Sequence, residues 1–309
     1  MAKSQMKFAI AIPQIFSGPR VETSSLRSFL TRAEALDYHS VWVQEQIFGK
    51  AGNLESVTLL SYAAALTQNV KLGAAVLLTL LRSPVQLAKS LATLDQLSNG
   101  RLIAGVGLGG NIRFYPAFDL SAEKRVARFT EGLRLMKRLW TEERVTFDGQ
   151  FWRLENASLQ PKPVQKPHPP IWFGARRPAA LKRAVELGDG FIGAGSSSIA
   201  EFREHVGHLR AFLSEARRDP SNFPIAKRVY LHMDPDKTRA LERLREWFGW
   251  YYGNATLADQ VALVGDAKEI IAGLQEVRSA GAELILLNPV IEETRQMELY
   301  TREIIPALG

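Results

Sequence analysis

The sequence predicts an α/β protein built as a single (β/α)8 TIM barrel, with insertions after the fourth and seventh strands. Short apolar segments alternate with helical segments along the 309 residues, as in a barrel of eight strand–helix units. The apolar segments are hydrophobic throughout rather than at every second position, which indicates parallel strands buried on both faces. No break in composition marks a linker, so residues 1–309 are expected to form one domain.

Residues 69–110 contain the clearest unit of this fold. An apolar run at 70–78 precedes an amphipathic helix at 84–97, and a second apolar run at 102–106 ends in glycines. Strand, helix and strand in this order require a right-handed crossover between parallel strands. Because α/β proteins bind ligands at the carboxyl ends of such strands, we expect the functional site at that end.

The other elements follow the same alternation. The first part of the chain predicts strands at 7–12 and 40–44 and helices at 21–37 and 54–68. After the central unit come a loop at 111–120, a helix at 123–140, a hairpin at 145–154 and a proline-rich extended segment at 160–170. The second half predicts strands at 171–173, 190–193, 226–233 and 283–287, helices at 178–187, 199–218, 236–250, 266–280 and 292–306, and an irregular or helical stretch at 251–264.

Composition excludes several classes of protein. No run of apolar residues is long enough to span a membrane, and the N-terminus does not have the pattern of a signal peptide. The absence of cysteine excludes disulfides, thiolate nucleophiles and Cys-ligated zinc, and is typical of a cytoplasmic protein. The net charge of +7 is spread along helices, which favours solvated helix faces over a nucleic-acid surface.

Metal and nucleophile motifs are weak. His205 and His208 lie three residues apart on a helix that should face outward, so we interpret them as part of a solvated face. His232, near the end of the seventh strand, is a candidate to point into the barrel mouth. No nucleophile elbow is present, and the serines at 196–198 are expected to cap the following helix. No metal site is predicted.

Three segments at the barrel rim are better candidates. The segment 174–178, Gly-Ala-Arg-Arg-Pro, joins a strand to a helix N-terminus, where free N–H groups and forked arginine donors favour an anion. The glycines at 105–110 lack the helix that a dinucleotide fingerprint needs, but they allow a flat ring or phosphate to approach the backbone. Glu45 and Gln46 pair a carboxylate with a carboxamide that can handle a proton or orient a substrate. Each segment has a simpler interpretation. The arginines of 174–178 could be solvated, the glycines at 105–110 could form a simple rim turn, and Glu45 could form a salt bridge at the rim.

Together these segments identify a family. The chain resembles the bacterial luciferase-like family of flavin- or deazaflavin-dependent oxidoreductases over nearly its whole length. The resemblance is carried by Ser40-Val-Trp-Val-Gln-Glu45 and by segments 72–110, 159–191 and 263–287. The segment 72–110 is most similar to the branch that uses the deazaflavin coenzyme F420.

The resemblance implies a (β/α)8 barrel with the cofactor at the strand carboxyl ends. A bulge in the third strand would carry a non-prolyl cis peptide between Ala75 and Val76 and back the ring. Gly107 and Gly109 would lie near the ribityl chain. The cofactor phosphate would be held by Gly174, Ala175 and Arg176. Gln14, which follows the first strand, is also predicted to contact the cofactor.

One departure from the family concerns proton transfer. Many deazaflavin enzymes have Asp-His at the end of the second strand, whereas this chain has Glu45-Gln46. Both residues are predicted to be catalytic. Glu45 keeps a carboxylate, but Gln46 can only form hydrogen bonds. The proton would then come from Glu45 or from the substrate.

The predicted function is hydride transfer between F420 and a small organic substrate. The alternative is an FMN-dependent monooxygenase that uses oxygen and reduced flavin from a partner reductase, and a second alternative is a flavin-free, non-catalytic barrel. The family further implies a homodimer through helices 54–68 and 84–97. An aromatic lid is predicted at Trp247, Trp250, Tyr251 and Tyr252, unless these side chains only pack the second insertion.

Overall fold

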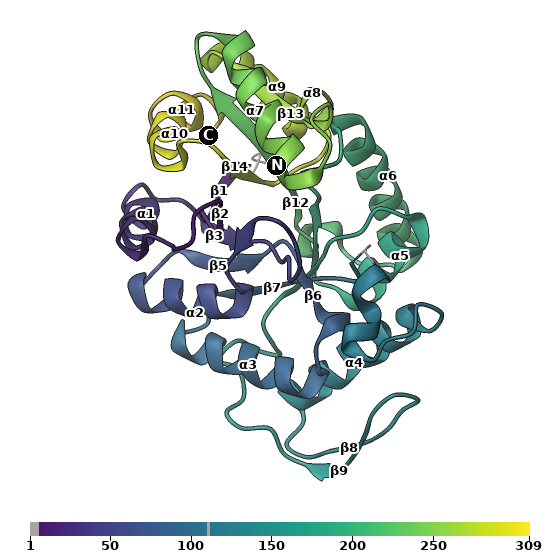
Figure 1. The fold of residues 1–309 in the computed structure, drawn as a ribbon. Helices are drawn as coiled ribbons and strands as arrows, with labels where there is room; N and C mark the ends of the chain where they lie inside the picture. Colours follow the sequence, from purple (N-terminus) through teal and green to yellow (C-terminus); the bar gives the residue numbers. More distant parts are fainter. Residues whose placement is uncertain (1–5, 110–111) are drawn as a thin grey trace.

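The computed structural model describes residues 6–109 and 112–309. Within them, parallel strands close into a barrel surrounded by helices (Figure 1). Around the ring these strands are β1 (Lys7–Ala11), β3 (Ser40–Val43), β5 (Lys71–Ala74), β7 (Leu102–Gly107), β10 (Ile171–Phe173), β11 (Gly190–Gly193), β12 (Ile225–Met233) and β14 (Leu284–Asn288). The β7–β10 and β14–β1 pairs complete the circle, so the predicted (β/α)8 fold is confirmed.

Helices cover the outside of this barrel. They are α1 (Thr23–Ala35), α2 (Ser56–Leu66), α3 (Pro84–Leu97), α4 (Arg125–Thr141), α5 (Pro178–Leu187), α6 (Ile199–Glu215), α9 (Ala267–Ser279), α10 (Glu293–Leu299) and α11 (Ile305–Leu308). The closing helix was predicted as one piece, but a π-helical turn at Tyr300–Ile304 separates α10 from α11. It lies just before Pro306, which has no N–H to continue the α-helical ladder. In the described residues, no helix has the length and hydrophobicity needed to cross a bilayer.

Two tryptophans fill the barrel interior. Trp42 and Trp172 pack with ring centroids 5.6 Å apart. An added Cβ at Gly73 would lie 2.4 Å from the Trp42 ring, and one at Gly190 would lie 2.7 Å from Trp172. Real Cβ atoms do not approach so closely, so β5 and β11 need glycine beside the indole rings. The tryptophans close the barrel interior beneath its carboxyl-terminal mouth.

The first insertion follows β7. It begins with a 3-10 helix at Ile112–Phe118, where a loop was predicted, and continues through α4 to the hairpin of β8 (Val145–Asp148) and β9 (Arg153–Ala157). The hairpin projects below the barrel in Figure 1. The proline-rich segment then returns the chain to β10, and its Gln160–Pro161 and Lys166–Pro167 bonds are cis.

The second insertion follows β12 and lies at the top of Figure 1. It contains α7 (Lys237–Tyr252), α8 (Leu257–Val261) and β13 (Ala262–Gly265). The strand β13 was not predicted, because the stretch 251–264 has no clear strand pattern. It forms because β12 extends three residues, 231–233, beyond its pairing with β14 and leaves an open edge there. β13 pairs in parallel with the last four residues of β12.

Candidate active site

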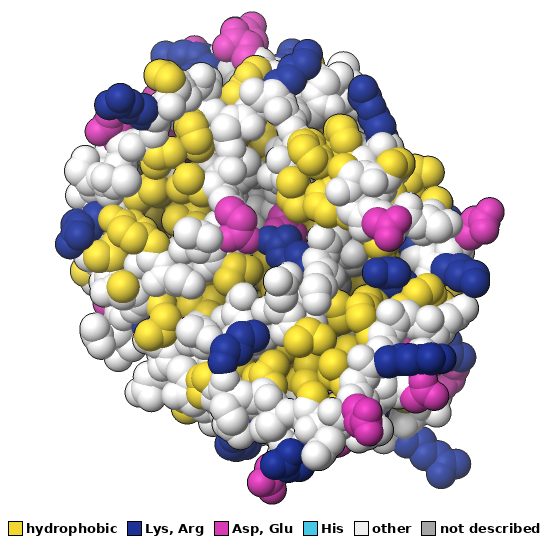
Figure 2. All heavy atoms as spheres, turned by 60° about the horizontal axis from the view of Figure 1, so that its bottom comes forward, with side chains coloured by type: hydrophobic (Ala, Val, Ile, Leu, Met, Phe, Trp, Pro, Cys, Tyr) yellow, Lys and Arg dark blue, Asp and Glu magenta, His cyan; other side chains and the backbone are white. Residues whose placement is uncertain are grey.

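A pocket opens at the carboxyl-terminal mouth of the barrel. Its walls come from the ends of β1, β3 and β14, from β12, from the residue that follows β5, and from α7 and α10. Apolar lining residues include Ala11, Trp42, Ala75, Trp247 and Leu286. The charged residues in the lining are Arg228 and Glu293. On the face drawn in Figure 2, hydrophobic side chains border a central region where acidic and basic side chains meet.

The third barrel strand breaks beside this pocket. Residues 71–74 form β5, the Ala75–Val76 peptide bond is cis, and the chain resumes pairing with β7 as β6 (Leu77–Leu78). The expected position of the cis bond is therefore confirmed. Ala75 faces the pocket and donates its backbone N–H to the Val43 carbonyl at 2.7 Å.

Glycines make room for the side chain of Val76. An added Cβ at Gly107 would lie 2.4 Å from Val76 Cγ2, and one at Gly174 would lie 2.9 Å from Val76 Cγ1. Gly109 has φ +77°, a backbone conformation that favours glycine. Gly107 and Gly174 thus have a packing role that the sequence did not reveal. Their predicted contacts with a cofactor stay predictions.

Glu45 lies outside the pocket lining. Its side chain is only 3% exposed and forms an ion pair with Arg82, which also binds Glu55 at 2.5 Å. Its second oxygen accepts the Leu78 N–H at 2.5 Å. Burial raises the pKa of Glu45, although Arg82 opposes that shift. Through these contacts Glu45 holds the segment after the cis bond in place. Its catalytic role stays a prediction.

Gln46 and Gln14 differ in their relation to the pocket. Gln46 is half-buried and packs on Gly49, its Oε1 finds no partner among the described residues, and it does not line the pocket. Gln14 does line the pocket, but its amide is already engaged. Its Nε2 donates to the Gln44 carbonyl at 2.7 Å and its Oε1 accepts the Gln44 N–H at 2.6 Å. Gln14 therefore ties the ends of β1 and β3 together.

The predicted anion site lies farther round the rim. Gly174, Ala175 and Arg176 connect β10 to the N-terminus of α5. Arg176 is exposed and donates to Ser196 Oγ at 2.5 Å, which draws this loop to the one between β11 and α6. Ser198 caps α6 with a capping box, as predicted. Two helix N-termini and an arginine therefore meet at one place, an arrangement that suits an anion.

Lys227 supports the loop between β11 and α6 from below. This residue of β12 is 2% exposed, and its Nζ donates to the carbonyls of Ala194 at 2.5 Å and Ser197 at 2.7 Å. Burial, reinforced by the positive charges of Arg228 and Arg176, lowers the pKa of Lys227 to about 7. A second basic group therefore lies beneath the rim segment, with a pKa near neutrality.

Arg228 and Glu293 were not predicted from the sequence. Arg228 lies in β12, where a charged residue inside an otherwise buried strand was a usable signal. Its Nε donates to Asn288 Oδ1 at 2.6 Å, and its Nη2 donates to the Tyr230 hydroxyl. Glu293 begins α10 and has no ion-pair partner among the described residues, and burial raises its pKa. Nothing in the local sequence singles out Glu293, because only the barrel brings it to the mouth.

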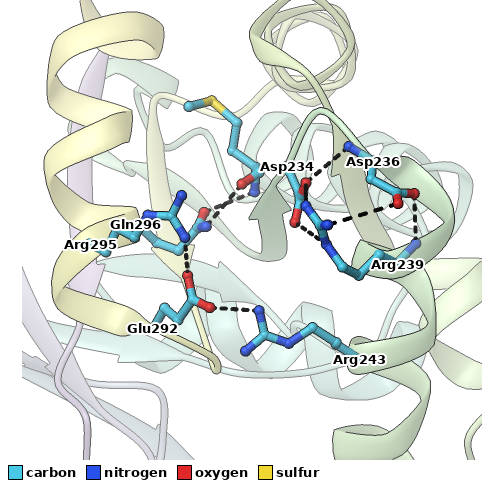
Figure 3. Close-up of polar contacts among 8 residues, drawn as sticks. Asp234, Asp236, Arg239, Arg243, Glu292, Arg295 and Gln296 are labelled. Atoms are coloured by element: carbon cyan, nitrogen blue, oxygen red, sulfur yellow. Dashed lines mark hydrogen bonds and ion pairs between the residues drawn. The ribbon is translucent and has the colours of Figure 1, made fainter.

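A polar network fixes the second insertion over the mouth (Figure 3). Glu292 binds Arg243 of α7 and Arg295 of α10, each at 2.6 Å. Arg239, also on α7, binds Asp234 at 2.6 Å. The network joins α7 to the start of α10, and thereby holds Trp247 and Glu293 on the same side of the pocket.

The aromatic residues of α7 only partly form the predicted lid. Trp247 lines the pocket, and Tyr251 stacks on it with ring centroids 4.8 Å apart. The Tyr252 hydroxyl lies 2.6 Å from that of Tyr230. Trp250 is 37% exposed and does not line the pocket.

The histidines do not form a metal centre in the part of the chain that is described. There, no three His, Cys, Asp or Glu side chains come close enough to hold a metal ion. His205 was expected on a solvated face, but it is buried and packs edge-on against Phe191. His232 is 1% exposed and does not line the mouth pocket.

Comparison with known proteins places this geometry in a family. The sequence pattern of the family described as luciferase-like monooxygenase matches residues 6–258. The chain belongs to the luciferase-like monooxygenase family. Its membership confirms the resemblance drawn from the sequence and makes the protein an enzyme of the luciferase-like class.

Relatives of both cofactor types occur in this family. The F420-dependent glucose-6-phosphate dehydrogenase of Kineococcus radiotolerans is 29% identical over 324 residues, which cover 94% of this chain and 95% of the relative. The FMNH2-dependent dimethylsulfone monooxygenase of Pseudomonas putida is 34% identical over 167 residues, or 53% of this chain and 46% of the relative. A solved F420-dependent secondary alcohol dehydrogenase in complex with an F420-acetone adduct shares the fold, with a TM-score of 0.86, 21% identity and 99% coverage of both chains.

Proposed function

We propose that this protein transfers a hydride between coenzyme F420, bound at the barrel mouth, and a small organic substrate. The observation that carries the proposal is the anion cradle at Gly174–Arg176 and Ser196, on the rim beside a pocket with Ala75 in its wall. Relatives that match nearly the whole chain are F420-dependent, which favours the deazaflavin over FMN.

The residues present fit such a coenzyme. The loop between β10 and α5 would hold its phosphate through Arg176 and the backbone N–H groups of 174 and 175. Gly107 and Gly174 make room for Val76, and so allow the chain to follow the cis bond that sets Ala75 in the pocket wall. The chemistry supplied by the bound coenzyme is two-electron hydride exchange, while the protein binds, orients and excludes water.

Glu293 is our candidate for proton handling in this reaction. It lines the pocket and has no ion-pair partner among the described residues, whereas Glu45 is bound to Arg82 and Gln46 has no titratable proton. Burial raises the pKa of Glu293 toward the range in which a carboxyl group both gives and takes protons. Glu45 and Gln46 would then act by bracing the end of β3.

The second candidate function is an FMN-dependent monooxygenase with a partner reductase. Its support is the Pseudomonas putida relative, which is more similar over a shorter segment. The flavin-free barrel is disfavoured by the small side chains of Ala11 and Ala75 in the pocket wall, because a lost cofactor site would be filled by larger groups.

Titration of the purified protein with F420 and FMN in parallel tests the proposal. Quenching of Trp42 and Trp247, which line the pocket, reports binding. We expect F420 to bind at least about tenfold more tightly than FMN, a difference of about 1.4 kcal/mol. Arg176→Ala should weaken F420 binding by about tenfold or more, because it removes a charged hydrogen bond to the phosphate. Arg177→Ala, the matched control, should change it less.

Either of two results would overturn the F420 assignment. Preferential FMN binding would favour the monooxygenase and call for an oxygen-uptake assay. If neither cofactor bound with a Kd below about 100 μM, which corresponds to a binding free energy of about 5.5 kcal/mol, hydride transfer at this pocket would be rejected. We further infer that residues 1–309 form a single domain, and that the protein is a cytoplasmic homodimer that associates through α2 and α3. Light scattering of the purified protein measures its mass and so checks the dimer.

A further inference from the structure

Arg228 is a buried cation without a carboxylate partner. The residue is 7% exposed, and no Asp or Glu among residues 6–109 and 112–309 forms an ion pair with it. The undescribed residues 1–5 and 110–111 contain no Asp or Glu at all. A buried charge that lacks a counterion is costly, so its presence points to a ligand that supplies the negative charge.

The groups around Arg228 leave part of its guanidinium available. Nε and Nη2 donate to Asn288 Oδ1 and the Tyr230 hydroxyl, which are both neutral acceptors. Tyr252 also forms a side-chain hydrogen bond with the guanidinium, whose five N–H donors still outnumber these three neutral acceptors among the described residues. Arg228 also lies 4.8 Å above the Tyr230 ring, which holds its plane in place. The arginine is therefore fixed in position and still has donors for a further acceptor.

Arg228 faces the pocket from the side opposite the Ala75–Val76 cis bond. In the closed ring, β12 lies four strands from β5 in either direction. Arg228 and Ala75 both line the mouth pocket, so they lie on opposing walls. A cofactor ring stacked on the bulge would leave the space toward Arg228 for the second reactant.

We propose that Arg228 binds the carboxylate of the substrate, and that the substrate is an organic carboxylic acid with an apolar body. The inference rests on the proposed function for the position of the cofactor. Among residues 6–109 and 112–309, Arg228 is the one cationic side chain in the pocket lining, so a single negative charge balances it, whereas a phosphate dianion would not be matched. Trp247, Leu286 and Val290 offer an apolar surface for the remainder of the molecule.

Glu293 does not compete for this role. It also lines the pocket, but it forms no ion pair with Arg228. The fork of Arg228 matches a planar carboxylate through two parallel hydrogen bonds. The pocket thus separates a group that anchors the substrate from a group that handles a proton.

The test compares benzoate with its neutral isostere benzamide and with phenyl phosphate, by quenching of the pocket tryptophans in F420-loaded protein. We expect benzoate to bind at least about tenfold more tightly than benzamide, or about 1.4 kcal/mol, and phenyl phosphate to bind no more tightly than benzoate. Arg228→Met should remove the preference for benzoate, while Arg134→Met, which removes an exposed arginine of α4, should keep it.

A second variant keeps the test informative if Arg228→Met fails to fold. Asn288→Asp places a carboxylate beside the 2.6 Å contact with Arg228 Nε and supplies the missing counterion internally. Benzoate binding should then fall to the level of benzamide, with F420 affinity retained. Equal binding of benzoate and benzamide to the native protein, or an unchanged preference in Asn288→Asp, would overturn the anchor. Tighter binding of phenyl phosphate would overturn the carboxylate class.

Failure of the proposed function gives a different pattern. If F420 does not bind but benzoate is still preferred over benzamide in the cofactor-free protein, the coenzyme assignment fails and the anion anchor stands. If F420 binds and the preference is absent, only the anchor fails. The cofactor titration and the carboxylate titration of the same samples therefore distinguish the two.

Discussion

At the residue scale, the site depends on side chains that fit only because a neighbour is small. Val76 follows the cis bond and fills space that Gly107 and Gly174 leave open. The glycine-rich end of β7 was interpreted from the sequence as a surface for a ring or phosphate. The structure gives Gly107 an additional and more local reason, which is contact with Val76.

Gly107→Ala is expected to destabilise the protein by about 1–3 kcal/mol, because the new methyl would lie 2.4 Å from Val76 Cγ2. Urea unfolding measures the loss. The double variant Gly107→Ala with Val76→Ala should recover much of it. Gly207→Ala is the matched control, since a Cβ there meets nothing within 4 Å and α6 gains a better helix former. Equal losses at both glycines would contradict the proposed packing.

Glu293→Gln is expected to lower kcat by roughly a hundredfold, because the pocket loses its candidate proton carrier. Burial raises the pKa of Glu293, so the pH profile of kcat should show a limb above the ordinary range of a glutamate. In the direction that needs the carboxylate as a base, activity falls as pH falls through this pKa. The limb should vanish in Glu293→Gln and persist in Glu45→Gln. A profile unaffected by Glu293→Gln would return the proton to Glu45 or the substrate.

Cofactor binding should be linked to the protonation of Lys227. Its pKa of about 7 is lowered by burial and by Arg228 and Arg176, and a bound phosphate beside Arg176 would offset those positive charges. Binding above pH 7 should therefore take up a proton, and F420 affinity should fall as pH rises through neutrality. Calorimetry in two buffers of different ionisation enthalpy measures the uptake. A binding enthalpy that is independent of the buffer would contradict this linkage.

At the element scale, the length of β12 organises the second half of the site. The nine residues of β12 pair with β14 and then with β13, and they present Lys227 and Arg228 to two different regions of the rim. The insertion that follows returns α7 over the mouth and joins it to α10 through Glu292. The position of Trp247 therefore depends on an ion pair that Arg243 makes about one helical turn away.

Arg243→Met is expected to raise the substrate KM several-fold and to leave stability nearly unchanged. The Arg243–Glu292 pair is about one-third exposed, and such pairs contribute roughly 0–1 kcal/mol. Loss of the pair would release α7 and the Trp247 wall, while cofactor affinity at the far rim is retained. Steady-state kinetics and thermal unfolding measure the two effects. Arg245→Met, also on α7, breaks an ion pair with Asp259 of α8 and is the control. Equal changes in KM for both variants would contradict a specific role for Glu292.

At the scale of the whole molecule, the barrel brings chain segments from both halves of the sequence to one mouth. Gln14, Ala75, Arg228 and Glu293 line a single pocket although 279 residues separate the first from the last. A ligand bound there contacts most of the barrel, so binding should stabilise the fold as a unit. Saturation at 100 times Kd corresponds to about 2.7 kcal/mol, or a rise of several degrees in Tm. F420 should produce this rise, and Arg176→Ala should reduce it. An unchanged Tm at saturating F420 would argue against binding at the mouth.

The sequence by itself determined the barrel, the order of its strands, both insertions and the family, because each rests on local patterns. Buried parallel strands are apolar along their whole length, and Ser198 capping α6 follows from a short-range motif. It also located the break at Ala75–Val76 by resemblance. It did not determine the strand β13, the packing of Val76 on glycines at the ends of β7 and β10, or the ion pair between Glu45 and Arg82. It also gave no signal for Glu293, and it did not show that Arg228 lacks a carboxylate partner among the described residues. Those facts depend on which distant segments meet at the mouth, and only closure of the barrel decides that.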